Sequence, residues 1–193
     1  MSISIFRWAA AVALLGALSG CAEKEADDGF VRGPGLKLSP LPVPSRVAVY
    51  DVALRSAFDV GPGLVLMLDP RLLPRESGLG EGRPMPKPVV DALRRERVVH
   101  GICQPPAEAS RAAPICDASS PGYIVRFSDV FRMGGDSVQL HIAVERYNTK
   151  TSVQSEILRF EKAFQVVGSG VNWRVARQGR FGLAGDRNHV TAR

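Results

Sequence analysis

The stretch between Gly122 and Arg180 constrains the fold of this chain more than any other feature. It contains four segments rich in Val, Ile, Phe and Tyr, and short stretches of Gly, Asn, Thr and Ser separate them. The segments are YIVRFSDVF, SVQLHIAVERY, SVQSEILRFEKAFQVV and VNWRVARQGR. β-Branched and aromatic residues bounded by turn residues are typical of strands. We therefore predict a four-stranded (or larger) antiparallel meander, and an α+β fold class in which one or two helices pack on this sheet.

The second of these segments shows the clearest alternation of apolar and polar residues. Its apolar side chains are Val138, Leu140, Ile142 and Val144, and the intervening polar ones are Gln139, His141 and Glu145. Because neighbouring side chains of a strand point to opposite faces, the apolar set is predicted to face the core, and His141 to face solvent or a pocket. Gly134-Gly135, just before this segment, predicts a tight hairpin with positive φ angles.

Two helices and one short strand are predicted before the sheet. Ser45 is a candidate N-cap for a helix whose apolar stripe is Val47, Tyr50, Leu54, Ala57 and Phe58. The continuous apolar run Leu64–Leu68 predicts a buried strand, and Pro88 suits the first turn of a second helix. A loop is predicted over 71–87, a stretch rich in Gly and Pro. Its GLGEG sequence is not predicted to bind phosphate, because it lacks the spacing and the Lys-Ser/Thr ending of a phosphate-binding loop.

The first 21 residues have the pattern of an export signal. One Arg precedes an apolar segment, Trp8–Leu18, which is shorter than the about 20 residues that a membrane-spanning helix needs. Leu18-Ser19-Gly20-Cys21 resembles the lipobox of bacterial lipoproteins. The resemblance implies cleavage before Cys21, attachment of acyl chains such as palmitate to Cys21, and a place in the cell envelope. Ala22, where an Asp would imply inner-membrane retention, favours the outer membrane.

Alternatives to this interpretation are a signal peptide with an incidental cysteine and an uncleaved anchor. With lipidation, the chain divides into a signal peptide (1–20), a lipidated N-terminus with a Pro/Gly-rich tether (21–45), a single α+β domain (46–182) and a disordered tail (183–193). The tether is acidic at first and then rich in Pro and Gly, a composition that cannot build a core.

Cys103 and Cys116 are the two remaining cysteines. An exported domain folds in an oxidising compartment, and the proline-rich segment between them has no apolar periodicity, so we predict a disulfide. His100, Cys103, Cys116 and Asp117 would be the ligands of an alternative metal site. No second CxxC or HxxxH pair accompanies them, so neither a metal nor a cofactor is predicted.

The charge pattern carries little functional information. The net charge is +6, and the densest basic run, Arg94-Arg95-Glu96-Arg97, is typical of a solvated helix surface. Without aromatic residues among the basic ones, no nucleic-acid partner is predicted. A basic face of the sheet is a further possibility, formed by Arg126, Arg159, Arg174 and Arg180.

Helices followed by a meander whose last strand contains Trp173 are similar to cystatin-like and NTF2-like α+β folds, over roughly Ser45 to Arg180. This resemblance implies a curved sheet that wraps a helix and can leave a pocket. NTF2-like proteins have more helix where this chain has a strand and a long loop. No functional residue is therefore carried over.

Three functional hypotheses follow. The first is a non-enzymatic envelope lipoprotein that binds a protein partner, since the sequence contains no nucleophile elbow, paired carboxylates, metal spacing or phosphate loop. The second is a carrier of a small ligand or lipid, whose pocket would be lined by Phe127, Leu140, Phe160 and Trp173. The third is an enzyme that uses His141 with Glu145 or Asp129. The same fold is compatible with all three hypotheses, so the fold alone does not discriminate among them.

Overall fold

The computed structural model describes residues 30, 37–57, 65–73, 82–104, 116, 122–147 and 159–180. The expected signal peptide, the lipidation residue Cys21 and the tail at 183–193 lie outside the described residues.

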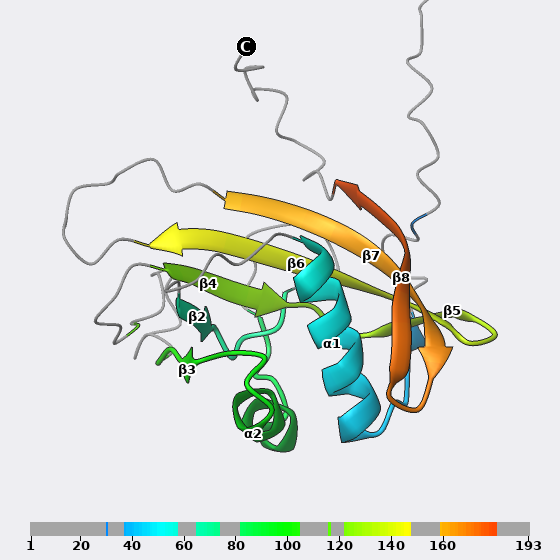
Figure 1. The fold of residues 1–193 in the computed structure, drawn as a ribbon, viewed down its shortest axis with the longest axis horizontal. Coiled ribbons are helices and arrows are strands. Elements are labelled where there is room, and N and C mark those ends of the chain that lie inside the picture. Colours follow the sequence, from blue (N-terminus) through cyan, green and yellow to red (C-terminus); the bar gives the residue numbers. More distant parts are fainter. Residues whose placement is uncertain are drawn as a thin grey trace, which may run out of the picture.

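The fold is α+β, with an eight-stranded sheet and, in the described ranges, two helices (Figure 1). The helices are α1 (Val43–Ala57) and α2 (Lys87–Arg95). The strands are β1 (Lys37–Leu38), β2 (Val65–Leu68), β3 (Gly101–Ile102), β4 (Gly122–Phe127), β5 (Phe131–Gly134), β6 (Ser137–Tyr147), β7 (Arg159–Ser169) and β8 (Asn172–Arg180).

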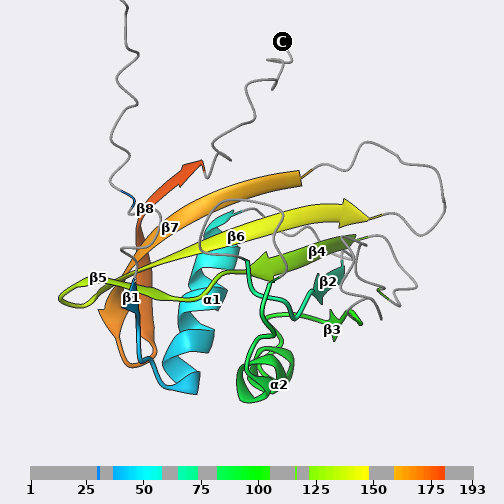
Figure 2. The same ribbon diagram turned by 180° about the vertical axis from the view of Figure 1, so that it is seen from behind.

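Strand β6 lies at the centre of the sheet. It pairs with β7 along one edge, and with both β4 and β5 along the other. Beyond these, β8 pairs with β7, β1 with β5, and β2 with β4. The sheet curls, and both helices lie on its concave side (Figures 1 and 2).

The prediction of a purely antiparallel sheet was wrong, because β2 runs parallel to both β3 and β4. Parallel neighbours need a crossover connection, and α2 provides it between β2 and the two later strands. The apolar run of β2 therefore joins the same sheet as the meander. The sheet is mixed.

The first predicted strand of the meander is in fact two strands. β4 and β5 occupy the same edge of β6, with Phe127 opposite Ile142 and Phe131 opposite Gln139. Ser128–Val130 interrupt the ladder between them. A polar pair inside an apolar run marks this break, and the contacts of Asp129 described below explain it.

The core fills the space between the concave face of the sheet and α1. From β6 it takes the whole apolar set predicted from the alternation, each residue at most 4 % exposed. Helix α1 contributes Val47, Tyr50, Ala53 and Leu54. Lys162 lies on the same face of β7 but donates a hydrogen bond from Nζ to the Ala57 carbonyl at 2.8 Å. It thereby satisfies an unpaired carbonyl at the end of the helix.

The turn between β5 and β6 agrees with the sequence. Gly134 and Gly135 have φ angles of 114° and 55°, which glycine adopts without strain. In β8, by contrast, a register shift opposite Gln165 and Val166 changes the alternation. Gln178 therefore lies opposite the buried Phe164, whereas Arg174 lies opposite Val167 on the other face. This bulge separates two residues whose even spacing would place them on one face of a regular strand.

The segment before α1 also differs from the expected tether. Phe30 is only 8 % exposed, Lys37–Leu38 pair with β5, and α1 begins at Val43, ahead of the predicted N-cap Ser45. The N–H groups in the first turn of a helix have no acceptor within the helix, so a proline there, which lacks an N–H, costs no hydrogen bond. Helix α1 can therefore include Pro44 in its first turn. The folded domain therefore begins before residue 46.

Candidate functional site

Buried polar side chains are the best indication of a site in this fold, because each needs a specific partner. The described residues contain seven: Ser39, Ser45, Asp69, Ser128, Asp129, Gln139 and His141. Ser128 and Asp129 lie at the break between β4 and β5. Asp69 lies just after β2, the strand that neighbours β4.

Asp129 is held by an arginine from a distant segment. Arg83 Nη2 lies 2.5 Å and 2.6 Å from the two carboxylate oxygens of Asp129. The Asp129 side chain is 8 % exposed, while that of Arg83 is 53 % exposed. The ion pair thus has one buried and one open partner, and it joins the segment before α2 to the sheet.

Tyr50 approaches the same place from α1. Its hydroxyl donates a hydrogen bond to the Ser128 carbonyl at 2.8 Å, and its ring stacks on Phe127 with centroids 4.4 Å apart. Burial raises the pKa of Tyr50 well above its usual value; Arg46 and Arg83 oppose that rise and Asp129 adds to it.

This raised pKa predicts a loss of stability at high pH. Tyr50 ionises in the unfolded chain near pH 10 but stays neutral in the fold, so its contribution is complete below pH 10 and is lost above it. The free energy of unfolding should fall above pH 10, with a slope that approaches about 1.4 kcal/mol per pH unit near pH 11. Urea unfolding at pH 8, 10 and 11 measures this fall. Comparison with Tyr50→Phe isolates the effect, and equal slopes for the two proteins would contradict it.

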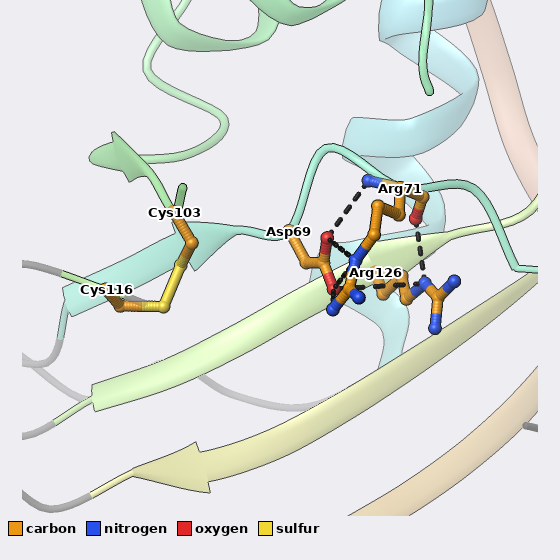
Figure 3. The surroundings of a disulfide bond; sticks show 5 residues. All are labelled: Asp69, Arg71, Cys103, Cys116 and Arg126. Carbon is orange, nitrogen blue, oxygen red and sulfur yellow. Dashed lines mark hydrogen bonds and ion pairs between the residues drawn. A yellow bond between two sulfur atoms is a disulfide. The ribbon is translucent and has the colours of Figure 1, made fainter. Parts of the chain in front are cut away.

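A second buried carboxylate, that of Asp69, lies between two arginines (Figure 3). Arg71 binds it with Nη2 at 2.7 Å and Nε at 3.0 Å. Arg126 lies 4.0 Å from it and donates to the carbonyls of Arg71 and Leu72 at 2.8 Å and 3.1 Å. Arg126 therefore ties two segments together rather than contributing to an open basic face.

Backbone hydrogen bonds join the two segments that flank residues 74–81. The Leu72 N–H donates to the Arg83 carbonyl at 2.8 Å, and the Met85 N–H to the Pro70 carbonyl at 2.7 Å. Gly82 permits the close approach, because a Cβ there would lie 1.8 Å from the Leu72 carbonyl oxygen. Both carboxylates are therefore neutralised by arginines that hold the backbone, an arrangement suited to a structural ion pair rather than to a general base.

His141 does not face solvent, which was one of the two positions that the alternation predicted. It is 1 % exposed, its Nε2 lies 3.1 Å from Gln139 Nε2, and the Phe131 ring lies 6.3 Å from its own. The face of β6 opposite α1 is thus covered at this point. Period-two alternation shows which residues share a face, but not whether that face is open.

The structure does not bring His141 together with its suggested acidic partners. Glu145 is four residues away on the same strand, about 13 Å at the rise of a strand. The Asp129 carboxylate faces Arg83 instead. His141 is linked to that region through its backbone: its N–H donates to Ser128 Oγ at 2.8 Å, and its carbonyl accepts from the Ser128 N–H at 2.9 Å.

The residues suggested as a pocket lining are mostly part of the packed core. Phe127 and Leu140 are fully buried in the cluster beneath α1. Trp173 is partly buried against that cluster, and its Nε1–H donates to the Gly170 carbonyl at 2.9 Å. The side chain of Phe160 lies outside the described residues.

Cys103 and Cys116, for which the sequence predicts a disulfide, are bonded to each other (Figure 3). His100 Nδ1 accepts a hydrogen bond from the Leu66 N–H at 3.1 Å, so the imidazole binds the backbone of β2. Asp117 lies outside the described residues. Within those residues, no group of three or more His, Cys, Asp or Glu side chains is placed to hold a metal ion, and no helix is both long and apolar enough to cross a bilayer.

Sequence reasoning missed Tyr50, Arg83 and Asp69 as members of a polar site. Arg83 is 46 residues from Asp129, and Tyr50 is 78 residues from Ser128. No local spacing connects such residues. The available signal was Asp129 itself, an acid inside the apolar run YIVRFSDVF, because a buried acid requires a partner somewhere in the chain.

Comparison with known protein families, with curated proteins and with solved structures finds no match to this chain.

Proposed function

We propose that this protein is a non-enzymatic, lipid-anchored binding module of the cell envelope, and that strand β8 is the surface it offers to a protein partner. The anchor is the lipidated Cys21 that the lipobox implies, with the outer membrane favoured. The disulfide supports an oxidising compartment, since such bonds are rare in the cytosol. The arginine-bound state of Asp69 and Asp129 supports a structural role for both acids.

The observation that carries this proposal is the open edge of β8. The strand spans Asn172–Arg180 and, among the described strands, pairs with β7 alone. Most of its residues are exposed, including Arg174, Ala176 and Arg177. An edge strand presents a row of backbone donors and acceptors to which an extended segment of another protein can add.

Charge selects the class of partner. The sequence of β8, NWRVARQGR, contains three arginines and no acid. Positively charged edges resist pairing with one another, which protects the protein against aggregation. The same charges favour an extended acidic segment, because opposite charges on adjacent strands stabilise pairing.

Phe30 is the described residue through which β8 contacts the segment that would carry the anchor. It packs against Ala163 of β7, and a Cβ on Gly179 of β8 would lie 2.7 Å from its ring. The absence of that Cβ gives the ring its space. Nine residue steps separate Cys21 from Phe30, which span at most about 30 Å. A lipidated Cys21 would therefore hold β8 near the membrane surface.

The test uses the mature chain with Cys21→Ser, labelled with ¹⁵N, and two synthetic peptides. One peptide alternates Glu and Val, and the other alternates Lys and Val. We expect the acidic peptide to shift the backbone amide resonances of Asn172–Gln178, and the basic peptide to leave them unchanged. The double variant Arg174→Glu/Arg177→Glu should weaken binding at least tenfold, since it removes two favourable charges and adds two repulsive ones.

The matched control is Arg94→Glu/Arg95→Glu, a change of equal charge on the exposed surface of α2. It should leave the affinity for the acidic peptide nearly unchanged. Equal responses to both peptides, or equal losses in the two double variants, would overturn the proposal. Binding that appears only after Glu23, Glu25, Asp27 and Asp28 are replaced by Ser would also overturn it, because the occupant would then be this chain's own acidic segment.

A further inference from the structure

The turn that joins β7 to β8 carries an exposed apolar side chain at its apex. Gly170 and Val171 form this two-residue turn, and Gly170 has a φ of 60°, which suits the first residue of such a turn. Val171 is 62 % exposed, more than any other large apolar side chain of the described residues. Gly, Asn, Asp and Ser dominate turns, and β-branched residues are rare there. The turn itself therefore does not require a valine.

A second turn lies beside the first at the same end of the sheet (Figures 1 and 2). It joins β5 to β6, and the Gly168 N–H donates a hydrogen bond to the Asp136 carbonyl at 3.0 Å. We call residues 132–137 and 167–174 the hairpin end. Met133 and Trp173 are half-buried there, and the Trp173 Nε1–H donates to the Gly170 carbonyl. Three apolar side chains, including that of Val171, thus reach the surface of the hairpin end.

Positive charge surrounds these apolar side chains. Arg132 and Arg174 are exposed and lie within three residues of the two turns, and the exposed Lys37 lies opposite Arg132. The acid of the hairpin end is Asp136, so three cations against one carboxylate leave a net charge of +2. Among the described residues, no ion pair includes Lys37, Arg132 or Arg174. Their charges are available to an external anion.

From these observations we propose that the hairpin end docks on an anionic phospholipid bilayer. Val171 enters the interface, and Arg132 and Arg174 bind lipid phosphates. An apolar residue flanked by Trp and basic residues is suited to the boundary between headgroups and acyl chains. A protein interface needs about 800 Å² from each partner with an apolar centre, which one valine between two half-buried residues does not supply. A bilayer, by contrast, can surround a single protruding turn.

The position of Phe30 allows the hairpin end and the expected lipid anchor to meet the same bilayer. Phe30 packs against Ala163, which precedes Gly170 by seven residues on β7, about 23 Å at the rise of a strand. The nine residue steps from Cys21 to Phe30 span at most about 30 Å. The segment is therefore long enough for both contacts at once. Only this step rests on the proposed anchor, and the edge of β8 is not part of the docking surface.

The test uses the mature chain with Cys21→Ser, so that binding comes from the domain and not from acyl chains. It is sedimented with vesicles of phosphatidylcholine, or of equal parts phosphatidylcholine and phosphatidylglycerol. We expect it to sediment with the anionic vesicles and to be released as salt is added, because salt screens the attraction. Trp173 is the single tryptophan of the mature chain, since Trp8 lies in the expected signal peptide. Its emission should shift to shorter wavelength on binding.

Variants of the hairpin end separate its apolar and charged contributions. Val171→Asp should weaken vesicle binding at least tenfold, because it removes a buried valine and adds a repulsive charge. Val171→Phe should tighten it. Lys37→Gln/Arg132→Gln should also weaken binding at least tenfold. These residues lie outside β8, so all three variants should bind the acidic peptide as before, which distinguishes this proposal from the function proposed for that strand.

Gln104→Glu is the matched control for Val171→Asp, because it changes the charge equally at an exposed position next to β3. It should leave vesicle binding nearly unchanged. Absence of binding to the anionic vesicles, equal binding to the neutral ones, or an equal loss in Gln104→Glu would overturn the proposal. Light scattering adds a further outcome. If Val171→Asp converts a dimer into a monomer, the occupant of the hairpin end is a second copy of this chain, and the proposal is wrong.

Discussion

Substitution of Phe127 by Ala is expected to lower the free energy of unfolding by about 3–5 kcal/mol. The Phe127 side chain is fully buried, and its ring stacks on Tyr50 at 4.4 Å. Removing it deletes that contact and leaves a cavity between α1 and β4 that close-packed neighbours cannot fill. Urea unfolding of the mature chain with Cys21→Ser, followed by the fluorescence of Trp173, measures the loss.

This prediction also separates a packed core from a ligand pocket. If Phe127 lined a pocket, its truncation would enlarge a space that already exists and would cost little. A loss below about 1 kcal/mol would therefore contradict the core position of Phe127 and favour the carrier hypothesis. Val171→Ala is the control, because Val171 is 62 % exposed and such changes stay within about 0.5 kcal/mol.

The elements of the fold could be predicted from the sequence because their signals are local. The alternation in β6, the apolar run of β2 and the proline at the start of α2 each lie within a few residues of the structure that they specify. The pairing of the strands could not be predicted in the same way. An apolar run such as Leu64–Leu68 has no feature that states whether its neighbour is parallel, and that depends on where α2 takes the chain.

The partners within the polar site could not be predicted from the sequence, for a related reason. Asp129 needed a cation, but the chain has 25 Lys and Arg residues, and only the folded arrangement selects Arg83 among them. The bulge in β8 had a comparable effect on the alternation of that strand. One extra residue reverses the alternation after it, so Gln178 and Arg174 lie on opposite faces although their spacing in sequence is even.

Replacement of Cys103 and Cys116 by Ala is expected to lower the free energy of unfolding by about 3 kcal/mol. The bond joins residues that are 13 apart in sequence, so its loss frees the unfolded chain to adopt many more conformations. The native fold also changes locally, because β3 pairs with β2 through only two residues, Gly101 and Ile102. Urea unfolding in the Cys21→Ser background measures the global loss.

The local part of this effect is tested by hydrogen exchange in the same pair of proteins. Cys103 is 1 % exposed, and its N–H donates to the Leu68 carbonyl at 2.8 Å. We expect faster exchange of the Cys103 position and of Ile102 beyond the change set by global unfolding, with Val125 in β4 following the global change alone. Equal stability with and without the bond, or uniform acceleration at all three positions, would show that the disulfide does not hold this edge of the sheet.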